Sequence, residues 1–293
     1  MKIKKSAKIG FCFGVRRALD ILEKEAEERG GLETLGEIVH NEQVLQQLAR
    51  QGIRVANSIP EIKGKTVVLS AHGVAPEVEE QIKTLGIEII NTTCPFVYRA
   101  QTAAKRLAEA DFFVIVYGDA NHAEVKGILG WAKGKGIATT DEKVVAKVKE
   151  LPRRIGILSQ TTMIPANFIG FVQKIMDNVY VKDSEIRIVD TICHDIRDRQ
   201  AAALELAGQV DVMLVIGGKN SANTSHLAEL CGTRAKTYKI ETAAELKKTW
   251  FKGKKRIGIT AGASTAGETI DEIMEKLAEF KALSGRNKST ARR

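Results

Sequence analysis

The sequence has few cysteines, and none of them stands in an arrangement that forms a local site. Its four cysteines are Cys12, Cys94, Cys193 and Cys231, and no two of them make a Cys-x-x-Cys pair. This spacing argues against a zinc ribbon, in which the ligands come in close pairs. A disulfide framework is implausible in a cytosolic chain of 293 residues. The remaining interpretations are packed thiols, a nucleophile, or a metal site assembled from distant segments.

Long apolar runs and nucleotide-binding fingerprints are also missing. The longest apolar candidates cover residues 112–117 and 212–216, far short of the roughly 18 residues of a membrane span. No apolar stretch follows the basic start MKIKKSAKIGF, so we predict no secretory leader and a cytoplasmic location. The segments GGKNSAN and TAGAST match neither the Walker nor the dinucleotide signature, and no nucleotide cofactor is expected.

The formal net charge is +9 at pH 7, but the excess is partly at the C-terminus. The last ten residues, SGRNKSTARR, contribute four basic residues and no acid. Elsewhere Lys and Arg are interspersed with Asp and Glu, so we expect no nucleic-acid partner. We predict that residues 284–293 form a disordered, dispensable basic tail. The mildly basic remainder suits a small polyanion such as a diphosphate ester.

Three segments of the chain share one layout, which indicates an internal repeat. In each segment a short apolar strand leads to a cysteine, and a helix rich in Arg and Ala follows. The three cysteines are Cys12, Cys94 and Cys193. In the first segment we expect the strand to cover Ile9 to Cys12. Cys231 lies outside this pattern.

Two polar loops follow in each repeat, each after a strand and before a helix. The interval from the cysteine to a polar residue of the first loop is 28 residues in every repeat, which selects His40, His122 and Ser221. In the second loop we align His72, Thr161 and Ser264. The constant interval makes a chance resemblance between the segments implausible.

Strands that alternate with helices of this length predict an α/β protein with parallel sheets. We expect three similar α/β repeats around a pseudo-threefold axis, at residues 1–92, 93–191 and 192–283. Ligands of parallel sheets bind at the carboxyl ends of the strands. Because the cysteine and both polar loops follow strands, we expect them to line one central cavity.

Three thiolates that meet on such an axis suit a [4Fe–4S] cluster in which one iron has no protein ligand. Thiolates are soft ligands, which favours iron–sulfur clusters or zinc over magnesium or calcium. A single cysteine is more often a packed core residue. Its repetition at one place in three repeats favours metal ligation by Cys12, Cys94 and Cys193. For Cys231 we expect a packed thiol.

The polar loops supply hydrogen-bond donors for phosphate oxygens, several of them just before helix N-termini. The set comprises His40, Asn41, His72, His122, Thr161, Ser221, Asn223 and Ser264. A lone histidine before a helix is usually a cap or a solvated residue. Three of the five histidines occupy these loops, however, which favours binding. His194 and His226 are expected to serve local structure.

Glu124 is the carboxylate closest to these histidines, in the segment Asn121-His122-Ala123-Glu124. Burial in a cavity would raise its pKa towards neutrality, which suits a carboxylic acid that relays protons. The ordinary alternative is a glutamate in the first turn of a helix, where its charge interacts favourably with the helix dipole.

The ordered motifs resemble those of the 4-hydroxy-3-methylbut-2-enyl diphosphate reductase family, also called LytB. They are GFCFGVRRA, GEIVHN, AHGV, TTCPFV, GDANHAEV, SQTT, DTICHDIRDRQ, KNSAN and TAGAST. The resemblance implies a [4Fe–4S] cluster on the three repeated cysteines, with the substrate hydroxyl on the free iron. It implies a catalytic set of Glu124, His122 and Thr161. It also implies diphosphate contacts from His40, His72, His122, Ser221, Asn223 and Ser264.

The reaction implied by the resemblance is a two-electron, two-proton loss of water that gives isopentenyl and dimethylallyl diphosphates. It is the last step of the methylerythritol phosphate route, and its electrons come from a carrier such as ferredoxin or flavodoxin. We expect a monomer or weak dimer and no membrane partner. One departure is Ala222, because the family pattern often has Ser-Ser-Asn where this chain has Ser-Ala-Asn. Ala222 is therefore left out as a side-chain donor.

Two other functions remain open from the residues. One is another three-cysteine iron–sulfur enzyme, such as a quinolinate synthase-like dehydratase, which performs no net reduction. The other is a non-catalytic iron–sulfur sensor whose basic tail contacts nucleic acid. The phosphate donors and Glu124 favour the reductase over both.

Overall fold

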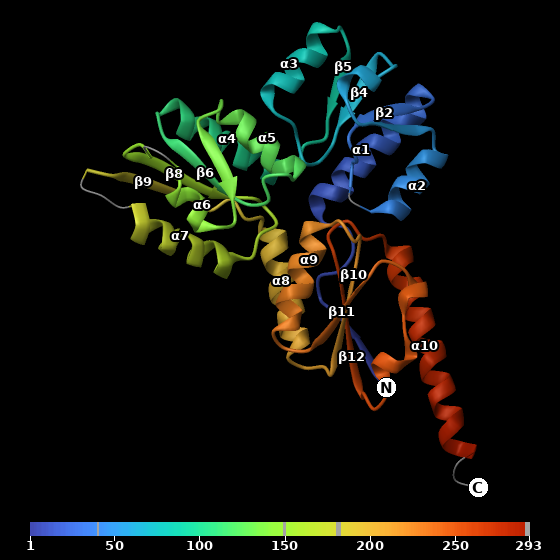
Figure 1. Ribbon diagram of the computed structural model, residues 1–293. Helices are drawn as coiled ribbons and strands as arrows, with labels where there is room; N and C mark the ends of the chain where they lie inside the picture. The colour runs from blue at the N-terminus through green and yellow to red at the C-terminus, as the bar shows by residue number, and fades with distance from the viewer. Residues whose placement is uncertain (40, 149–150, 180–182, 291–293) are drawn as a thin grey trace. The chain divides into compact units, whose positions relative to one another are not determined.

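The computed structural model describes residues 1–39, 41–148, 151–179 and 183–290 (Figure 1). The chain divides into two compact units, which are described separately. Unit 1 comprises Met1–Cys12, His40–Val44 and Asp195–Arg293, and unit 2 comprises Phe13–Val39 and Leu45–His194. Among the described residues, no helix is both long and apolar enough to cross a membrane.

The first sheet of unit 2 has four parallel strands in the order β3-β2-β4-β5. They are β2 (Leu32–Leu35), β3 (Ile53–Ala56), β4 (Thr66–Leu69) and β5 (Glu88–Asn91). The connecting helices are α1 (Phe13–Arg29), α2 (Glu42–Arg50), whose first residues belong to unit 1, the 3-10 helix η1 (Ile59–Glu61) and α3 (Pro76–Thr84). Val67 and Leu69 pack against Ile82 of α3. This packing fixes the loop that follows β4.

The second sheet of unit 2 is also parallel, in the order β7-β6-β8-β9. Its strands are β6 (Phe113–Tyr117), β7 (Gly136–Thr139), β8 (Arg154–Ser159) and β9 (Glu185–Val189). Its helices are α4 (Pro95–Glu109), α5 (Ala123–Trp131), α6 (Glu142–Ala146) and α7 (Pro165–Val179). Val114 packs with Ile128 of α5, whereas its neighbour Ile115 packs with Phe171 of α7. Successive strand residues point to opposite faces, so apolar residues at both positions bury both faces.

The sheet of unit 1 is parallel, in the order β1-β12-β10-β11. Its strands are β1 (Lys2–Lys5), β10 (Val212–Ile216), β11 (Lys236–Ile240) and β12 (Arg256–Ala261), and its 3-10 helices are η2 (Ala243–Glu245) and η3 (Lys248–Phe251). In Figure 1, α8 (His194–Ala207) and α9 (Ala222–Gly232) cover one face and α10 (Gly267–Thr290) covers the other. Met213 packs against the α8 and α9 side, and Leu214 packs against α10.

The predicted fold class is confirmed, because the structure has three similar α/β repeats, each with a parallel four-stranded sheet. The expectation that the first strand runs into Cys12 was wrong. The strand is Lys2–Lys5, and it pairs with β12 of the third repeat. Gly10, between this strand and Cys12, has a φ of +84°, a left-handed conformation that no strand continues through. The repeat boundaries stay a prediction.

The C-terminal segment also differs from the prediction. Helix α10 continues to Thr290, so residues 284–290 are helical and not the disordered tail that we expected. The segment contains no proline, and its single glycine at 285 does not end the helix. Residues 291–293 lie outside the described part of the chain.

Candidate functional site

Glu124 and Thr161 form a buried hydrogen-bonded pair in unit 2. Glu124 is in the first turn of α5 and its residue is only 2% exposed, and Thr161 follows strand β8. The Glu124 carboxylate accepts the Thr161 backbone N–H at 2.7 Å and the Thr161 hydroxyl at 3.0 Å. Two residues that we selected from different loops are therefore in direct contact.

Burial raises the pKa of Glu124 from 4.5 to about 7, while the two hydrogen bonds from Thr161 act in the opposite direction. Removing a carboxylate from water disfavours its charged form, and this effect outweighs the two hydrogen bonds. A carboxyl group with this pKa is partly protonated near neutral pH. It can therefore donate a proton as well as accept one.

Two predicted histidines meet beside this pair. His122 caps α5, and its Nδ1 accepts the Glu124 backbone N–H at 3.1 Å. In the neutral ring this bond leaves the proton on Nε2, which can donate to an anion. His72, from the loop after β4, has its ring centroid 5.4 Å from that of His122 at an interplanar angle of 84°. The two repeats of unit 2 thus contribute one histidine each to a single place.

The His72 loop is held by two donors that converge on one carbonyl. Val74 O accepts the indole N–H of Trp131 at 3.1 Å and the side-chain amide of Gln101 at 3.4 Å. Gln101 is on α4 and Trp131 ends α5, so two helices of the second repeat hold the loop of the first. A Cβ at Gly130 would collide with Ala75, which shows how closely the loop packs on α5. We call Val74, Gln101 and Trp131 the loop clamp.

In unit 1, the N-terminus of helix α9 presents a set of polar groups. Ser221 is the N-cap of α9, and its hydroxyl oxygen accepts the Thr224 backbone N–H at 3.3 Å. Its own O–H proton stays able to donate. Ser225, one turn further along the helix, donates its hydroxyl to the Ser221 carbonyl at 3.1 Å and so stabilises the cap. The first backbone N–H groups of a helix attract anions, and Ser221 adds a hydroxyl to them.

Asn223, two residues into α9, is 6% exposed. Within the described residues, neither its side-chain nitrogen nor its oxygen has a hydrogen-bond partner. A buried polar group without a partner costs about 1–3 kcal/mol, so such groups usually have a ligand to bind. A Cβ at Gly262 would collide with Thr224 and come within 3.6 Å of the Asn223 amide nitrogen, so glycine at this position leaves room for the two side chains.

Ser264, in the loop after β12, is also buried and belongs to unit 1. Its carbonyl accepts the side-chain amide of Asn41 at 2.9 Å, and the Asn41 side-chain oxygen accepts the Val44 N–H at 3.2 Å. Asn41 therefore joins the first polar loop of the first repeat to the second polar loop of the third repeat. His40, which we also predicted to bind the substrate, lies outside the described residues.

The three repeated cysteines have the same backbone anchor. The N–H of Cys94 donates to Ala71 O at 3.0 Å, that of Cys193 to Thr161 O at 3.0 Å, and that of Cys12 to Ala263 O at 2.9 Å. Each acceptor lies two residues after the end of a strand, namely β4, β8 or β12. The loop after this strand thus holds the cysteine as well as the predicted polar residue.

These anchors correct our alignment of the second loops by one residue. Thr161 corresponds to Ala71 and Ala263, and therefore not to His72 and Ser264. The shared Leu-Ser dipeptides at residues 69–70 and 158–159 hide this offset in the sequence. Thr161 is thus the one member of its structural position with a hydroxyl, which allows the contact with Glu124.

Within the described part of the chain none of the three cysteines forms a disulfide; Cys193 is buried, and Cys12 and Cys94 are half-buried. Cys94 and Cys193 belong to unit 2 and Cys12 belongs to unit 1. Among the described residues, no group of three or more His, Cys, Asp or Glu side chains stands together as a metal site. A Cβ at residue 14 would lie 2.5 Å from the Cys94 sulfur, so Gly14 leaves space beside this thiol. Thiolates are soft donors, so the chemistry of these three side chains fits an iron–sulfur group.

The fourth cysteine behaves as predicted. Cys231 is fully buried between α8 and α9 with Ala203 and Leu227. Burial raises the pKa of its thiol to about 12, so it stays protonated and is a poor metal ligand.

Sequence reasoning missed Gln160 and the loop clamp. Gln160 is fully buried, its side-chain oxygen accepts the Asp119 N–H at 3.2 Å, and its side-chain nitrogen has no partner among the described residues. Its position directly before Thr161 in the sequence could have identified it as a candidate site residue. Gln101 and Trp131 offered none, because their partner is a backbone carbonyl in another repeat.

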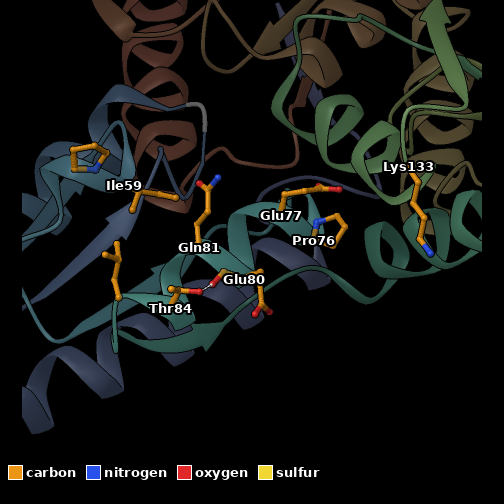
Figure 2. Close-up of a pocket in the computed structure, with 9 residues that line it drawn as sticks. Ile59, Pro76, Glu77, Glu80, Gln81, Thr84 and Lys133 are labelled. Carbon is orange, nitrogen blue, oxygen red and sulfur yellow. Dashed lines mark hydrogen bonds between the residues drawn. The ribbon is translucent and has the colours of Figure 1, made fainter.

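A surface groove of about 1060 Å³ lies elsewhere in unit 2, beside η1 and α3 (Figure 2). Its lining includes Ile59, Glu77, Gln81 and Lys133, and no predicted site residue. We therefore do not associate it with the site.

Comparison with known proteins gives a consistent result. Residues 3–278 match the family model described as "LytB protein". A 4-hydroxy-3-methylbut-2-enyl diphosphate reductase of Dehalococcoides mccartyi (strain CBDB1) is 59% identical, over 96% of this chain and 99% of the relative. The enzyme of the same name from Geobacter metallireducens is 41% identical, over 96% and 98%.

Solved structures agree. A structure of (E)-4-hydroxy-3-methyl-but-2-enyl diphosphate reductase is 36% identical with a TM-score of 0.68, over 95% of this chain and 99% of that one. The E-1-hydroxy-2-methyl-but-2-enyl-4-diphosphate reductase from Plasmodium falciparum has a TM-score of 0.87 at 24% identity, over 94% and 87%. The latter likeness supports the fold alone.

Proposed function

The chain belongs to the LytB protein family, and we propose that it reduces 4-hydroxy-3-methylbut-2-enyl diphosphate, the reaction for which its relatives are named. The substrate loses its hydroxyl as water, and two electrons and two protons enter. The products are isopentenyl diphosphate and dimethylallyl diphosphate, as in the last step of the methylerythritol phosphate route. Family membership favours this reaction over a quinolinate synthase-like dehydration and over an iron–sulfur sensor.

The observation that carries the proposal is the buried Glu124–Thr161 pair. Loss of an allylic hydroxyl as water requires a proton at that oxygen, and Glu124 is the buried carboxyl group with a pKa near 7. Thr161 donates to the carboxylate through both its N–H and its hydroxyl, which fixes the position of the acid. Thr161 is also placed to contact the substrate near its hydroxyl.

Cys12, Cys94 and Cys193 would hold the iron–sulfur group. A [4Fe–4S] cluster with three cysteine ligands supplies an iron that acts as a Lewis acid for the hydroxyl and accepts electrons from a carrier. The backbone N–H groups of the three cysteines donate to equivalent loop carbonyls, which supports equivalent roles. A ferredoxin or flavodoxin is the carrier we propose, acting on a monomer or weak dimer.

The polar side chains of the predicted loops would bind the diphosphate. In unit 1 these are the α9 N-terminus with Ser221 and Asn223, and Ser264. In unit 2 they are His72 and His122, whose rings already lie together. His40 completes the proposed set. Ala222 contributes only a backbone N–H.

Glu124 then moves a proton to the departing oxygen while the phosphate donors hold the other end of the substrate. His122 orients Glu124, because its ring accepts the backbone N–H of the same residue. Burial of the carboxyl group excludes bulk water from the proton and so limits its exchange.

Anaerobic turnover tests the proposal. Cluster-reconstituted protein, dithionite-reduced methyl viologen and the allylic diphosphate should give both five-carbon diphosphates with consumption of two electrons per molecule. No product from protein with a full complement of iron and sulfide would contradict the reductase assignment.

A further inference from the structure

Two strongly exposed aromatic side chains flank the cysteines of the chain. Phe13, which directly follows Cys12 and begins α1, is 58% exposed, and Tyr98 on α4, four residues after Cys94, is 59% exposed. Neither stabilises a core in this position. Exposed large apolar groups that cluster on a surface commonly mark a site of interaction with another molecule.

The beginning of α1 lies against Cys94. A Cβ at Gly14 would be 2.5 Å from the Cys94 sulfur. The Arg17 guanidinium donates to Thr92 O at 3.3 Å and to Thr93 O at 3.5 Å, just before that cysteine. Phe13, which precedes Gly14, and Tyr98, whose backbone N–H donates to Cys94 O at 2.9 Å, are therefore both near Cys94.

Further aromatic and cationic groups continue this surface. The Phe96 ring centroid is 6.1 Å from that of His194, the exposed residue after Cys193, and the Arg99 guanidinium lies 5.7 Å from the Phe96 centroid. We call Phe13, Arg16, Phe96, Tyr98, Arg99 and His194 the cysteine-flanking surface. It lies beside Cys94 and includes the residue next to Cys193.

Around Phe13 and Tyr98 the charge of this surface is positive, and Asp195, which follows His194 on α8, forms an ion pair with Arg199. The first turns of α1 and α4 contain no acidic residue. Arg16 and Arg99 are both exposed, and neither has an ion pair within the part of the chain that the structure describes. Arginines and aromatic residues are enriched at protein interfaces, where a cationic patch attracts an acidic partner and speeds its association.

We propose that the cysteine-flanking surface is the docking site of an acidic one-electron carrier protein. This inference rests on the proposed function, which requires two electrons per turnover from outside the chain, since its sequence has no dinucleotide-binding signature. Two reduced carriers dock in turn, and each loses one electron. The two electrons and two protons convert the substrate to product and water. The site beside the cysteines keeps the path of the electron short.

Arg99→Glu, with Arg16→Glu as a second variant, tests the surface. The probe is an acidic two-iron ferredoxin, and the control is Arg50→Glu, an exposed arginine at the end of α2. Two quantities are measured for each cluster-loaded protein at low ionic strength: the Kd of the oxidised ferredoxin by calorimetry, and turnover with reduced ferredoxin or with methyl viologen. We expect Arg99→Glu and Arg16→Glu each to raise the Kd and the KM for ferredoxin about tenfold, with viologen turnover unchanged.

The outcomes separate the two proposals. An unchanged Kd and KM in both variants, or an equal rise in Arg50→Glu, would overturn the docking surface while the reaction stands. A fall in viologen turnover equal to the fall with ferredoxin would also overturn it, because the residues would then act on the chemistry. A wild-type protein that turns over with neither donor would contradict the proposed function itself.

Discussion

Unit 1 and unit 2 present their functional side chains in opposite ways. In unit 2 four predicted side chains already lie in pairs, Glu124 with Thr161 and His72 with His122, although the buried Gln160 keeps a side-chain nitrogen without a partner among the described residues. In unit 1 the buried amide of Asn223 has no partner among the described residues. The charge is also divided, because unit 1 has 22 Lys and Arg against 13 Asp and Glu, whereas unit 2 has 23 of each.

The difference fits the separate roles that we propose for the two units. A preformed hydrogen-bonded acid can act on a substrate without rearrangement, which suits the proton transfer assigned to unit 2. An unpaired buried amide in a basic unit gains its hydrogen bonds only when an anion arrives, which suits phosphate binding. Substitutions in unit 2 should therefore affect turnover, and those in unit 1 should affect affinity.

The largest effect is expected from Glu124→Gln. The amide keeps the size of the side chain but has no carboxyl proton to give, so kcat should fall by about a hundredfold or more with little change in KM. Steady-state kinetics with methyl viologen measures both constants. Glu109→Gln, which changes an exposed carboxylate at the end of α4, is the control. Near-normal turnover by Glu124→Gln would move proton delivery to another group.

The raised pKa of Glu124 also predicts how stability depends on pH. Because this pKa is about 7 in the folded protein and about 4.5 in the unfolded chain, the folded state binds more protons between these pH values. Stability from this group is therefore complete below about pH 4.5 and is lost as pH rises through 7, by roughly 3 kcal/mol in total. Urea unfolding at pH 5 and pH 8 should show this loss in the wild type and not in Glu124→Gln. Equal losses in both proteins would exclude a pKa near 7.

Asn223→Ala should affect binding and leave stability almost unchanged. Loss of a hydrogen bond to a charged group costs about 1.5–3 kcal/mol, so the Kd for inorganic diphosphate should rise about tenfold to a hundredfold. Asn41→Ala is the matched comparison, because Asn41 makes two hydrogen bonds within unit 1. It should lower the free energy of unfolding by about 1–3 kcal/mol. If Asn223→Ala destabilised the protein as much as Asn41→Ala, Asn223 would be a structural residue.

Trp131→Phe should have the smallest effect. The change removes one of the two donors to Val74 O in the loop clamp and leaves Gln101 in place. We expect a KM increase of a few fold and an unchanged kcat, because His72 shifts while Glu124 does not. Trp250→Phe, at an indole that stacks on Tyr238 in unit 1, is the control. A change in kcat without a change in KM would assign the clamp to the chemistry.

The repeated architecture could be predicted from the sequence, because hydrophobic strands, helices and polar loops recur at a fixed interval. Glu124 and Thr161 could be selected because both follow strands whose carboxyl ends share an edge. The pairing of β1 with β12 could not be found, since nothing local to residues 2–5 distinguishes one partner sheet from another. The same holds for the loop clamp, whose acceptor is a backbone carbonyl that any residue possesses.

The one-residue error in the second loops has a different origin. Similar dipeptides were matched, but the residue that anchors a cysteine is decided by the length of the strand before it. The unpaired state of Asn223 likewise depends on which neighbours fold around it, and a sequence does not list them.

We propose that Cys12, Cys94 and Cys193, but not the buried Cys231, hold one [4Fe–4S] cluster. The most direct measurement is the electron paramagnetic resonance spectrum of anaerobically prepared, dithionite-reduced protein, compared among the four Cys→Ser variants. We expect the signal of a reduced [4Fe–4S] cluster in the wild type and in Cys231→Ser. We expect its loss in each of the other three variants. A wild-type protein that shows no such signal and contains neither iron nor labile sulfide would contradict this proposal. A signal that is lost only in Cys231→Ser would contradict it as well.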